Sequence, residues 1–404
     1  MILLFVLITG SYVMLIGFLI LGWNRISLFK LKGLPPTVHF SIVIPYRNEA
    51  ENLPHLLSSF LHLDYPDTHF EILLVNDSSE DNSRKICADF RNDHPRFRIT
   101  LLENKKSSNS PKKDAITTAI HKAIFPYILC TDADCRFPPL WLQAFNEKIL
   151  KTDADLVAAP VAIDLPTPPQ VNYRKEKIQD SEMSNENWEA NRHTRSLKYL
   201  YAFQEMDLLS LQAAGAGGFG VEKAFMANAA NLCYRKKDFL NLNGFEGNLQ
   251  ISSGDDVFLL QKFTEKKLKT TFLKCREAIV TTRPEPDLTS LISQRIRWAA
   301  KTPAYKSKFA RFTGIVVLLM NFIILLGFAL VLFDILSYEP VIITFLFKFV
   351  IDFILLYKAA TFFDRKEILR NYFWSSLLYP LFSSTIAILS LFRKFEWKGR
   401  VSKR

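Results

Sequence analysis

Four long apolar segments leave only the middle of this 404-residue chain to form a water-soluble domain. Residues 1–22 carry no charge and are long enough to cross a hydrocarbon layer of roughly 30 Å. Three similar segments lie near the C-terminus, at 314–336, 341–360 and 373–392. About 250 residues remain between the two groups, which is enough for one α/β domain with a full core. We therefore predict one such domain at 36–285.

Basic residues after the first apolar segment predict the orientation of this domain. Arg25, Lys30 and Lys32 follow it directly, which favours the cytoplasmic side for the next residues. No basic stretch precedes the segment and no clear cleavage site follows it, so we expect an uncleaved anchor. The chain is expected to be a multi-pass protein of the cell inner or plasma membrane.

The C-terminal membrane region, residues 313–392, is predicted to hold two or three spans. Its middle segment carries Lys348 and Asp352, four residues apart, and either spans as a neutralised pair or lies in the interface. Three full spans would place the basic tail at 393–404 outside the cell, against the usual charge rule. Either one segment does not cross fully or the tail breaks the rule.

The net charge of +11 does not by itself indicate nucleic-acid binding, because much of the excess lies in that tail. A basic tail after an apolar segment is more simply a contact with the membrane surface. We expect membrane lipid and no nucleic acid among the partners. The five cysteines form no C-x-x-C pair and are expected to be reduced thiols in or near the core.

Short apolar runs alternate with helical spacing across the middle of the chain, which predicts an open, mostly parallel α/β sheet. The expected strands are HFSIVIPY, FEILLVND, FRITLLEN, YILCTDAD and ADLVAAPV. Residues 164–200 are interpreted as a polar insertion or a solvated helix. Residues 286–312 mix apolar and basic side chains, as an amphipathic segment at a membrane surface does. The glycines from Gly215 to Gly220 are interpreted as a flexible loop.

Two carboxylates, Asp132 and Asp134, follow an apolar run that we predict to be a strand. In extended backbone, residues two apart point to the same side. Paired oxygen donors at a strand end suit Mg²⁺ or Mn²⁺ bridging a diphosphate. Other acids and bases are expected nearby: Asp77 and Glu49 as nucleotide contacts and Lys112 as a phosphate contact. The alternatives are that the DAD triplet is a solvated turn, that Asp77 caps the next helix, that Glu49 faces a helix dipole and that Lys112 is solvated.

Two further motifs extend the predicted site. Asp255 and Asp256 precede an apolar helical stripe, and a helix start helps to keep a general base ionised. Gln294, Arg297 and Trp298 of QRIRW share one helical face, where a guanidinium can bind a leaving diphosphate and an indole can pack on a sugar. Simple helix capping and a basic aromatic interfacial helix remain the respective alternatives.

Taken in order, SIVIPYRNEAENL, NDSSED, the DAD triplet, SGDD and QRIRW resemble the inverting family 2 glycosyltransferases with a GT-A fold, over residues 38–300. The resemblance implies a role for each matching position. The nucleotide sugar would be bound by Pro45, Glu49, Asp77, Lys112 and Asp132, and the metal would be bound by Asp132 and Asp134. The acceptor and the diphosphate would be contacted by Asp255, Gln294, Arg297 and Trp298. Asp256 would be the catalytic base. The sequence departs where NDSS replaces DDGS and where Pro111 replaces a glycine.

The implied reaction is a single displacement with inversion, assisted by Mg²⁺ or Mn²⁺, from a nucleotide-diphosphate sugar, a UDP-sugar first, to a lipid or glycan hydroxyl. The Q-x-x-R-W motif is similar to that of polysaccharide synthases and of ceramide glucosyltransferases. Because polymer-extruding members usually have more membrane helices, we favour a lipid or lipid-linked acceptor over processive synthesis. A non-catalytic membrane scaffold and a nucleotidyltransferase are the alternatives of other classes.

Overall fold

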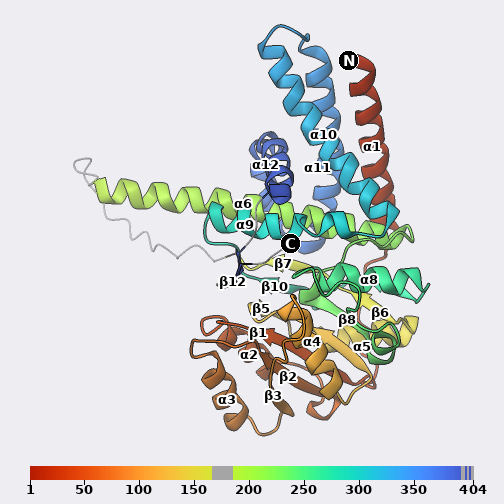
Figure 1. The fold of residues 1–404 in the computed structure, drawn as a ribbon, viewed down its shortest axis with the longest axis vertical. Helices are drawn as coiled ribbons and strands as arrows, with labels where there is room; N and C mark the ends of the chain where they lie inside the picture. The colour runs from red at the N-terminus through yellow and green to blue at the C-terminus, as the bar shows by residue number, and fades with distance from the viewer. Residues whose placement is uncertain (166–184, 393–395, 398–399, 402–404) are drawn as a thin grey trace.

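The computed structural model describes residues 1–165, 185–392, 396–397 and 400–401 (Figure 1). A sheet-containing domain lies at one end and a group of long helices at the other, with the N-terminus at the far tip of the helices. Much of the predicted insertion at 164–200, and most of the predicted tail at 393–404, lie outside the described residues.

The central sheet has seven strands in the order β3-β2-β1-β4-β8-β6-β9. Their bounds are β1 Phe40–Tyr46, β2 Phe70–Asn76, β3 Ile99–Glu103, β4 Tyr127–Cys130, β6 Leu156–Ala158, β8 Leu232–Arg235 and β9 Thr270–Phe272. The first four are parallel to their neighbours, whereas β8 runs antiparallel to β4 and β6. The prediction of a mostly parallel α/β sheet is confirmed. Every residue of β2 is buried, as expected for a strand covered on both faces.

Helices and a small second sheet complete the domain. The helices are α2 Leu53–Leu61, α3 Ser83–Asp93, α4 Pro111–Lys122, α5 Trp141–Thr152, α7 Lys236–Asn241, α8 Asp255–Glu265 and α9 Leu288–Ala299. The second sheet contains β5 Cys135–Arg136, β10 Val280–Thr282 and β7 Val161–Ile163 in that order. Single 3₁₀ turns lie at Asp67–His69, Ala229–Asn231, Arg276–Ala278 and Thr302–Ala304, a longer one lies at Lys366–Asn371, and a small hairpin joins β11 Glu396–Trp397 to β12 Arg400–Val401.

Strand β1 extends past the end of β4 on the side where the site residues gather. The pairing of β1 with β4 stops at Val43 and Cys130, while its pairing with β2 continues to Tyr46. The carbonyl of Val43 accepts from the N–H of Thr131, and the carbonyl of Tyr46 accepts from the N–H of Asp77. The backbone N–H and C=O groups of odd-numbered residues of β1 therefore point toward β4. Pro45 therefore faces the side where β4 has ended, and its missing N–H removes no ladder hydrogen bond.

Helix α6, Asn185–Gly220, runs between the domain and the long helices (Figure 1). Its glycine-rich end crosses α1, Ile2–Arg25, at backbone contact. A Cβ on Gly220 would lie 1.9 Å from the carbonyl oxygen of Gly22, and one on Gly217 would lie 2.4 Å from that of Leu19. The prediction of a flexible loop at Gly215–Gly220 is therefore wrong. Those glycines are helical, and they allow two backbones to touch.

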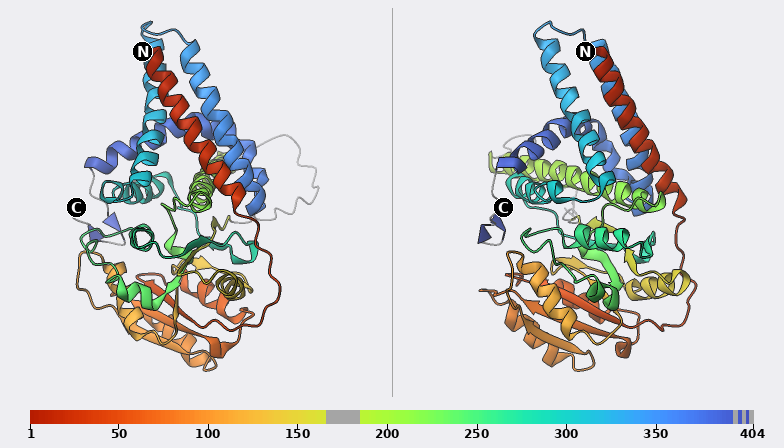
Figure 2. Two further views of the ribbon diagram at one scale, coloured as in Figure 1. Left: turned by 90° about the vertical axis from the view of Figure 1, so that its right-hand side faces the viewer. Right: turned by 45° about the vertical axis from the view of Figure 1, so that its right-hand side comes forward.

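Four helical segments are long and apolar enough to cross a membrane: Ile2–Arg25, Lys308–Leu332, Glu339–Phe363 and Lys366–Phe392. The first three are α1, α10 and α11, which stand roughly side by side (Figure 2). The last contains α12, Tyr372–Phe392. Figure 1 views α12 nearly end-on and Figure 2 shows it crossing the others, so this helix lies across the group rather than along it.

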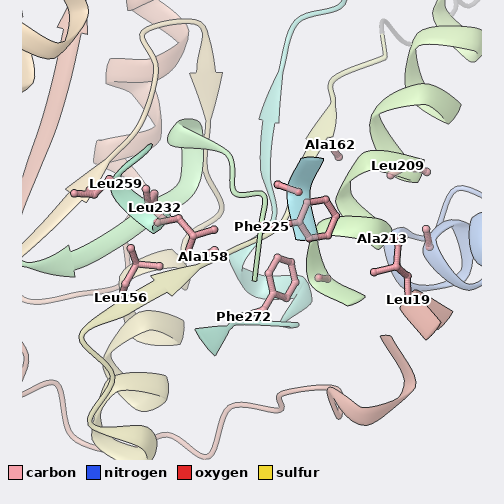
Figure 3. Close-up of a cluster of buried hydrophobic side chains, with 14 of the residues drawn as sticks. Leu19, Leu156, Ala158, Ala162, Leu209, Ala213, Phe225, Leu232, Leu259 and Phe272 are labelled. Atoms are coloured by element: carbon pink, nitrogen blue, oxygen red, sulfur yellow. The ribbon is translucent and has the colours of Figure 1, made fainter. Parts of the chain in front are cut away.

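One hydrophobic core continues from the sheet into the long helices (Figure 3). Leu156 and Leu232 of the sheet and Leu259 of α8 belong to the same buried cluster as Leu209 of α6 and Leu19 of α1. All five cysteines, each within the described ranges, are buried and form no disulfide, as the sequence predicted. The continuous core packs the domain directly against α1.

Candidate active site

A cavity of about 1500 Å³ opens near the carboxyl ends of the strands and reaches α10 and α12. Its wall contains most of the side chains to which the sequence assigned roles: Lys112, Asp132, Asp134, Asp255, Asp256, Gln294, Arg297 and Trp298. Among the residues that the structure describes, Pro45, Glu49 and Asp77 are not part of this wall. Folding thus gathers the predicted metal, base and acceptor residues, while the predicted nucleotide contacts occupy neighbouring positions.

Lys112, in the first turn of α4, joins two of these carboxylates. Its Nζ lies 2.7 Å from Oδ1 of Asp132 and 3.3 Å from Oδ2 of Asp255. Burial alone would lower the pKa of Lys112, but the two carboxylates raise it above its usual value, so the ammonium stays charged. The sequence alternative of a solvated lysine is wrong, because the side chain is mostly buried in an ion-pair network.

The DAD triplet departs from the expected geometry. Strand β4 ends at Cys130, and the residues between it and β5 form a turn in which the N–H of Cys135 donates to the carbonyl of Asp132. Nevertheless, both Asp132 and Asp134 face the cavity. Oδ2 of Asp134 accepts from the hydroxyl of Thr282 at 3.1 Å, which anchors the turn to β10. A turn pinned to the second sheet, rather than an extended strand, places the two carboxylates together.

Asp255 and Asp256 begin α8, as predicted, and the residue before them explains the sharp entry. Gly254 has φ +82°, and a Cβ there would lie 2.8 Å from the ring of Phe258. Burial would raise the pKa of Asp255, but Lys112 and Lys301 outweigh it and hold this pKa below its usual value. Asp255 is therefore an ionised partner of the lysines.

Asp256 has a different environment from its neighbour. Its Oδ1 lies 3.3 Å from Nζ of Lys301, and its Oδ2 accepts from the backbone N–H of Ala229 at 3.3 Å. The side chain is 14% exposed and lines the cavity. Asp256 is thus fixed in position and remains within reach of a molecule in the cavity, as a general base requires.

Helix α9 carries the QRIRW motif. Gln294, Arg297 and Trp298 line the cavity, as their helical spacing predicts. Gln294 donates to Glu285 across the cavity rim. Burial lowers the pKa of Arg297, while Asp132 and Glu285 counteract this, which places the guanidinium in the field of the site carboxylates. The polar face of α9 therefore lines the cavity.

Arg295, which follows Gln294, also lines the cavity and secures the helix. Its Nε lies 2.6 Å from Oδ2 of Asp207 in α6, and both side chains are almost fully buried. Oδ1 of Asp207 accepts from the hydroxyl of Tyr379 in α12 at 3.2 Å. The guanidinium also lies over the Trp298 ring, 4.2 Å from its centre. Arg295 therefore joins α9, α6 and α12 at the cavity wall.

The same contacts continue into the long helices. Nζ of Lys348 in α11 lies over the ring of Tyr379 at 5.4 Å and over the ring of Tyr12 in α1 at 5.5 Å. Lys348 also pairs with Asp352, which accepts from the hydroxyl of Tyr12 at 2.7 Å. The predicted pairing of Lys348 with Asp352 is present. A chain of polar contacts thus runs from the motif helix to α1.

The predicted nucleotide residues lie at the ends of β1 and β2. Asp77 is 4% exposed and its Oδ1 accepts from the amide of Asn104 at 2.7 Å. Glu49 accepts from Asn52 at 2.7 Å, and the start of α3 is bonded by Asp81. Their roles in binding a nucleotide stay predictions. Lys113, which follows Lys112 in α4, is buried and donates to the carbonyls of Asn248 and Ile251, so it supports the loop before α8.

The donor set of Asp132 and Asp134 fits a hard divalent cation in part. Mg²⁺ and similar ions bind through one or two carboxylates and take their other ligands from phosphate and water. No group of three His, Cys, Asp or Glu side chains that could hold a metal ion occurs in the described part of the chain. The residues therefore suit a cation that arrives with a diphosphate, and not a site built from protein ligands alone.

Several side chains of the site were missed at the sequence level. Lys301 pairs with Asp256, Glu285 bonds Gln294, and Asp207 holds Arg295. Lys301 follows Arg297 by four residues, so helical spacing was a usable signal for it. Asp207 and Glu285 lie outside any motif, and no local pattern pointed to them.

Comparisons with known proteins agree with this geometry. Residues 41–209 match the family model described as Glycosyl transferase family 2. A poly-beta-1,6-N-acetyl-D-glucosamine synthase of Staphylococcus epidermidis is 37% identical over 94 residues, which are 23% of this chain and 21% of that protein. An undecaprenyl-phosphate 4-deoxy-4-formamido-L-arabinose transferase of Proteus mirabilis is 32% identical over 100 residues, 24% of this chain and 30% of that protein. The matched segments thus span less than a third of these relatives.

A solved structure resembles the whole chain. The mannosyltransferase PcManGT from Pyrobaculum calidifontis, in complex with GDP-Man and Mn²⁺, has a TM-score of 0.52 at 13% sequence identity. The likeness covers 97% of this chain and 99% of that one. At this identity it supports the fold and not the substrate. Residues 41–209 are thus similar to glycosyl transferase family 2 domains, and the solved structure shares the fold of the chain.

Proposed function

We propose that this protein is a membrane-anchored inverting glycosyltransferase that moves a sugar from a nucleotide-diphosphate sugar to a hydroxyl of a lipid or lipid-linked acceptor. The observation that carries the proposal is one cavity in which Asp132, Asp134 and Asp256 face Lys112 and Arg297. A single displacement requires carboxylates that bind a metal ion and positive side chains that stabilise the diphosphate. It also requires a separate carboxylate that accepts the proton of the acceptor hydroxyl.

In this proposal each residue of the site has a distinct role. A Mg²⁺ or Mn²⁺ ion held by Asp132 and Asp134 would neutralise the diphosphate of the donor. Arg297 stabilises the charge that develops as the diphosphate leaves. Asp256, positioned by Lys301 and the Ala229 N–H, accepts the proton of the acceptor hydroxyl as that oxygen attacks the anomeric carbon. Attack from the face opposite to the leaving group inverts the configuration.

The donor is proposed to be a UDP-sugar, with Pro45, Glu49 and Asp77 near its nucleoside. The solved mannosyltransferase contains GDP-Man, so guanosine sugars belong in the same screen. Processive polysaccharide synthesis is the second candidate, favoured by the match to the Staphylococcus epidermidis synthase.

The proposed topology follows from the direction of α12. With α1, α10 and α11 as full spans and α12 lying across them, both the domain and the C-terminal tail lie on the cytoplasmic side. The parity conflict then disappears. Of the three C-terminal segments, the last and not the middle one would be interfacial. A thiol reagent added outside intact cells should not label cysteines introduced at Asn109 or Lys403, whereas efficient labelling at Asn109 would reverse the orientation.

Transfer by the full-length protein in lipid nanodiscs tests the activity. The protein is incubated with a panel of UDP- and GDP-sugars, Mn²⁺ and membrane lipid extract, and products are identified by mass. One or few added sugars on a lipid are expected, whereas a long polymer supports the second candidate. Asp256→Asn should remove the product, while Asp89→Asn, an exposed carboxylate of α3, should not. A panel that yields no product with any donor contradicts the proposal.

A further inference from the structure

The cavity that holds the site carboxylates is larger than their task requires. Small-molecule pockets usually measure about 300–1,000 Å³, whereas this one measures about 1500 Å³. The additional part of its wall is formed by α10 and α12. We call this part the acceptor groove and define it by Gly314, Leu318 and Phe322 of α10 with Ser383, Ala387 and Leu391 of α12.

The groove is a continuous face on each helix. Its residues follow one another by four positions on α10, and they do so again on α12, so each set forms one stripe. Phe322 is 48% exposed and Leu391 is 52% exposed although both line the cavity. The groove is therefore partly open, and its large exposed side chains favour an apolar partner.

The cavity wall differs in polarity between the site carboxylates and the groove. One end holds Asp255, Asp256 and Arg297, and the other holds the large apolar side chains of the groove. Both groove helices belong to segments that are long and apolar enough to lie in a membrane. A molecule that fills the whole cavity must join a hydroxyl-bearing polar head to a long aliphatic part. A sugar polymer does not match the apolar end, because its hydroxyls would lose water there without gaining partners.

We propose that the groove between α10 and α12 binds the aliphatic chain of the acceptor lipid, which enters from the side out of the bilayer and places its hydroxyl next to Asp256. This inference rests on the proposed function, and it specifies where the acceptor chain lies and that the chain contributes to binding. The donor occupies the Asp132 end of the same cavity, so the two substrates meet at Asp256.

Ala387→Phe tests the groove by filling it from α12. The matched control is Ala329→Phe in α10, because Ala329 is also half-buried and is not part of the cavity wall. Transfer is measured in nanodiscs with two acceptors that carry the same head, one with a long chain and one with a short, water-soluble chain. Hydrolysis of the nucleotide sugar without acceptor reports on the donor end.

Ala387→Phe should raise KM for the long-chain acceptor roughly ten-fold, as expected when a few methylenes are no longer buried. Transfer to the short-chain acceptor and donor hydrolysis should change less than about two-fold. Equal losses with both acceptors, or no loss with either, would overturn the groove assignment. Absence of transfer to every acceptor by the unmodified protein would instead overturn the proposed function.

A crosslinking experiment covers the case in which Ala387→Phe does not fold. A photoreactive group at the end of the long chain is activated in the unmodified protein, and the labelled peptides are sequenced. Labels on α10 and α12 support the groove. Labels confined to α1 or to the outer face of α11 contradict it. Leu318→Ala, which widens the groove, should weaken long-chain binding and leave short-chain transfer unchanged.

Discussion

The two halves of the cavity are held in place in different ways. In the donor half, Lys112 and Asp132 are 20 positions apart and lie on neighbouring βα units of the parallel sheet. In the acceptor half, Arg295 depends on Asp207 in α6, and Asp207 also depends on Tyr379 in α12. The positions of the residues in the donor half are determined by local sequence and by the order of the strands. The acceptor half depends on helices that are far apart in the chain, and those helices continue toward the membrane.

Removal of divalent cations should have the largest effect, and it acts on the donor half. Because Asp132 and Asp134 have no third protein carboxylate, imidazole or thiolate ligand among the described residues, the cation is expected to bind weakly and to be removable. EDTA should abolish transfer, and Mn²⁺ or Mg²⁺ should restore it. Asp134→Asn should lose most of the activity at saturating metal. Full turnover in EDTA would contradict the metal assignment.

Asp256→Asn should be the next largest effect, and it separates the two halves. Loss of a general base lowers transfer by roughly 10² to 10⁴, while binding of the nucleotide sugar should remain nearly unchanged. Asp255→Asn should act differently, because this carboxylate pairs with Lys112 and should affect donor binding instead. Single-turnover transfer and donor titration measure the two effects. Near-normal transfer in Asp256→Asn together with loss in Asp255→Asn would assign the base to Asp255.

Asp207→Asn should weaken the acceptor half by releasing Arg295. Removing one partner of a buried ion pair destabilises by about 3–5 kcal/mol, and the loss should appear in thermal unfolding. Transfer should fall because α9 loses its attachment to α6, with a higher KM for acceptor and an unchanged KM for donor. Asp89→Asn is the control. An equal rise in both KM values would show that the two halves are not held separately.

The buried carboxyl of Glu205, also in α6, should make the stability of the protein depend on pH, which is a smaller effect. This carboxyl in α6 is fully buried, and burial raises its pKa to about 7, although Arg365 lies 3.4 Å away. Because the folded pKa exceeds the unfolded one, the fold binds the proton more tightly, and stability should fall as pH rises from about 4.5 to about 7. The change is at most about 3 kcal/mol. Glu205→Gln should remove most of the change in unfolding temperature with pH over this range. An unchanged dependence of the unfolding temperature on pH would contradict the assignment.

The sequence by itself determined part of the sheet and the motif residues. Continuous apolar runs predicted β1, β2, β3 and β4, since strands buried on both faces need them. Helical spacing predicted that Gln294, Arg297 and Trp298 share a face, and the cavity wall contains all three. These features follow from local periodicity, which depends only on nearby residues.

Only the tertiary structure decided how the membrane part meets the site. The glycines at Gly217 and Gly220 are helical because α1 crosses them at backbone contact, and no local signal shows a partner about 200 residues away. An apolar segment of the length of α12 satisfies the composition of a span equally well when it lies across the others. Its direction is set by packing and by the Tyr379 contact with Asp207. Hydropathy measures how apolar a segment is, whereas its direction depends on which other helices it contacts.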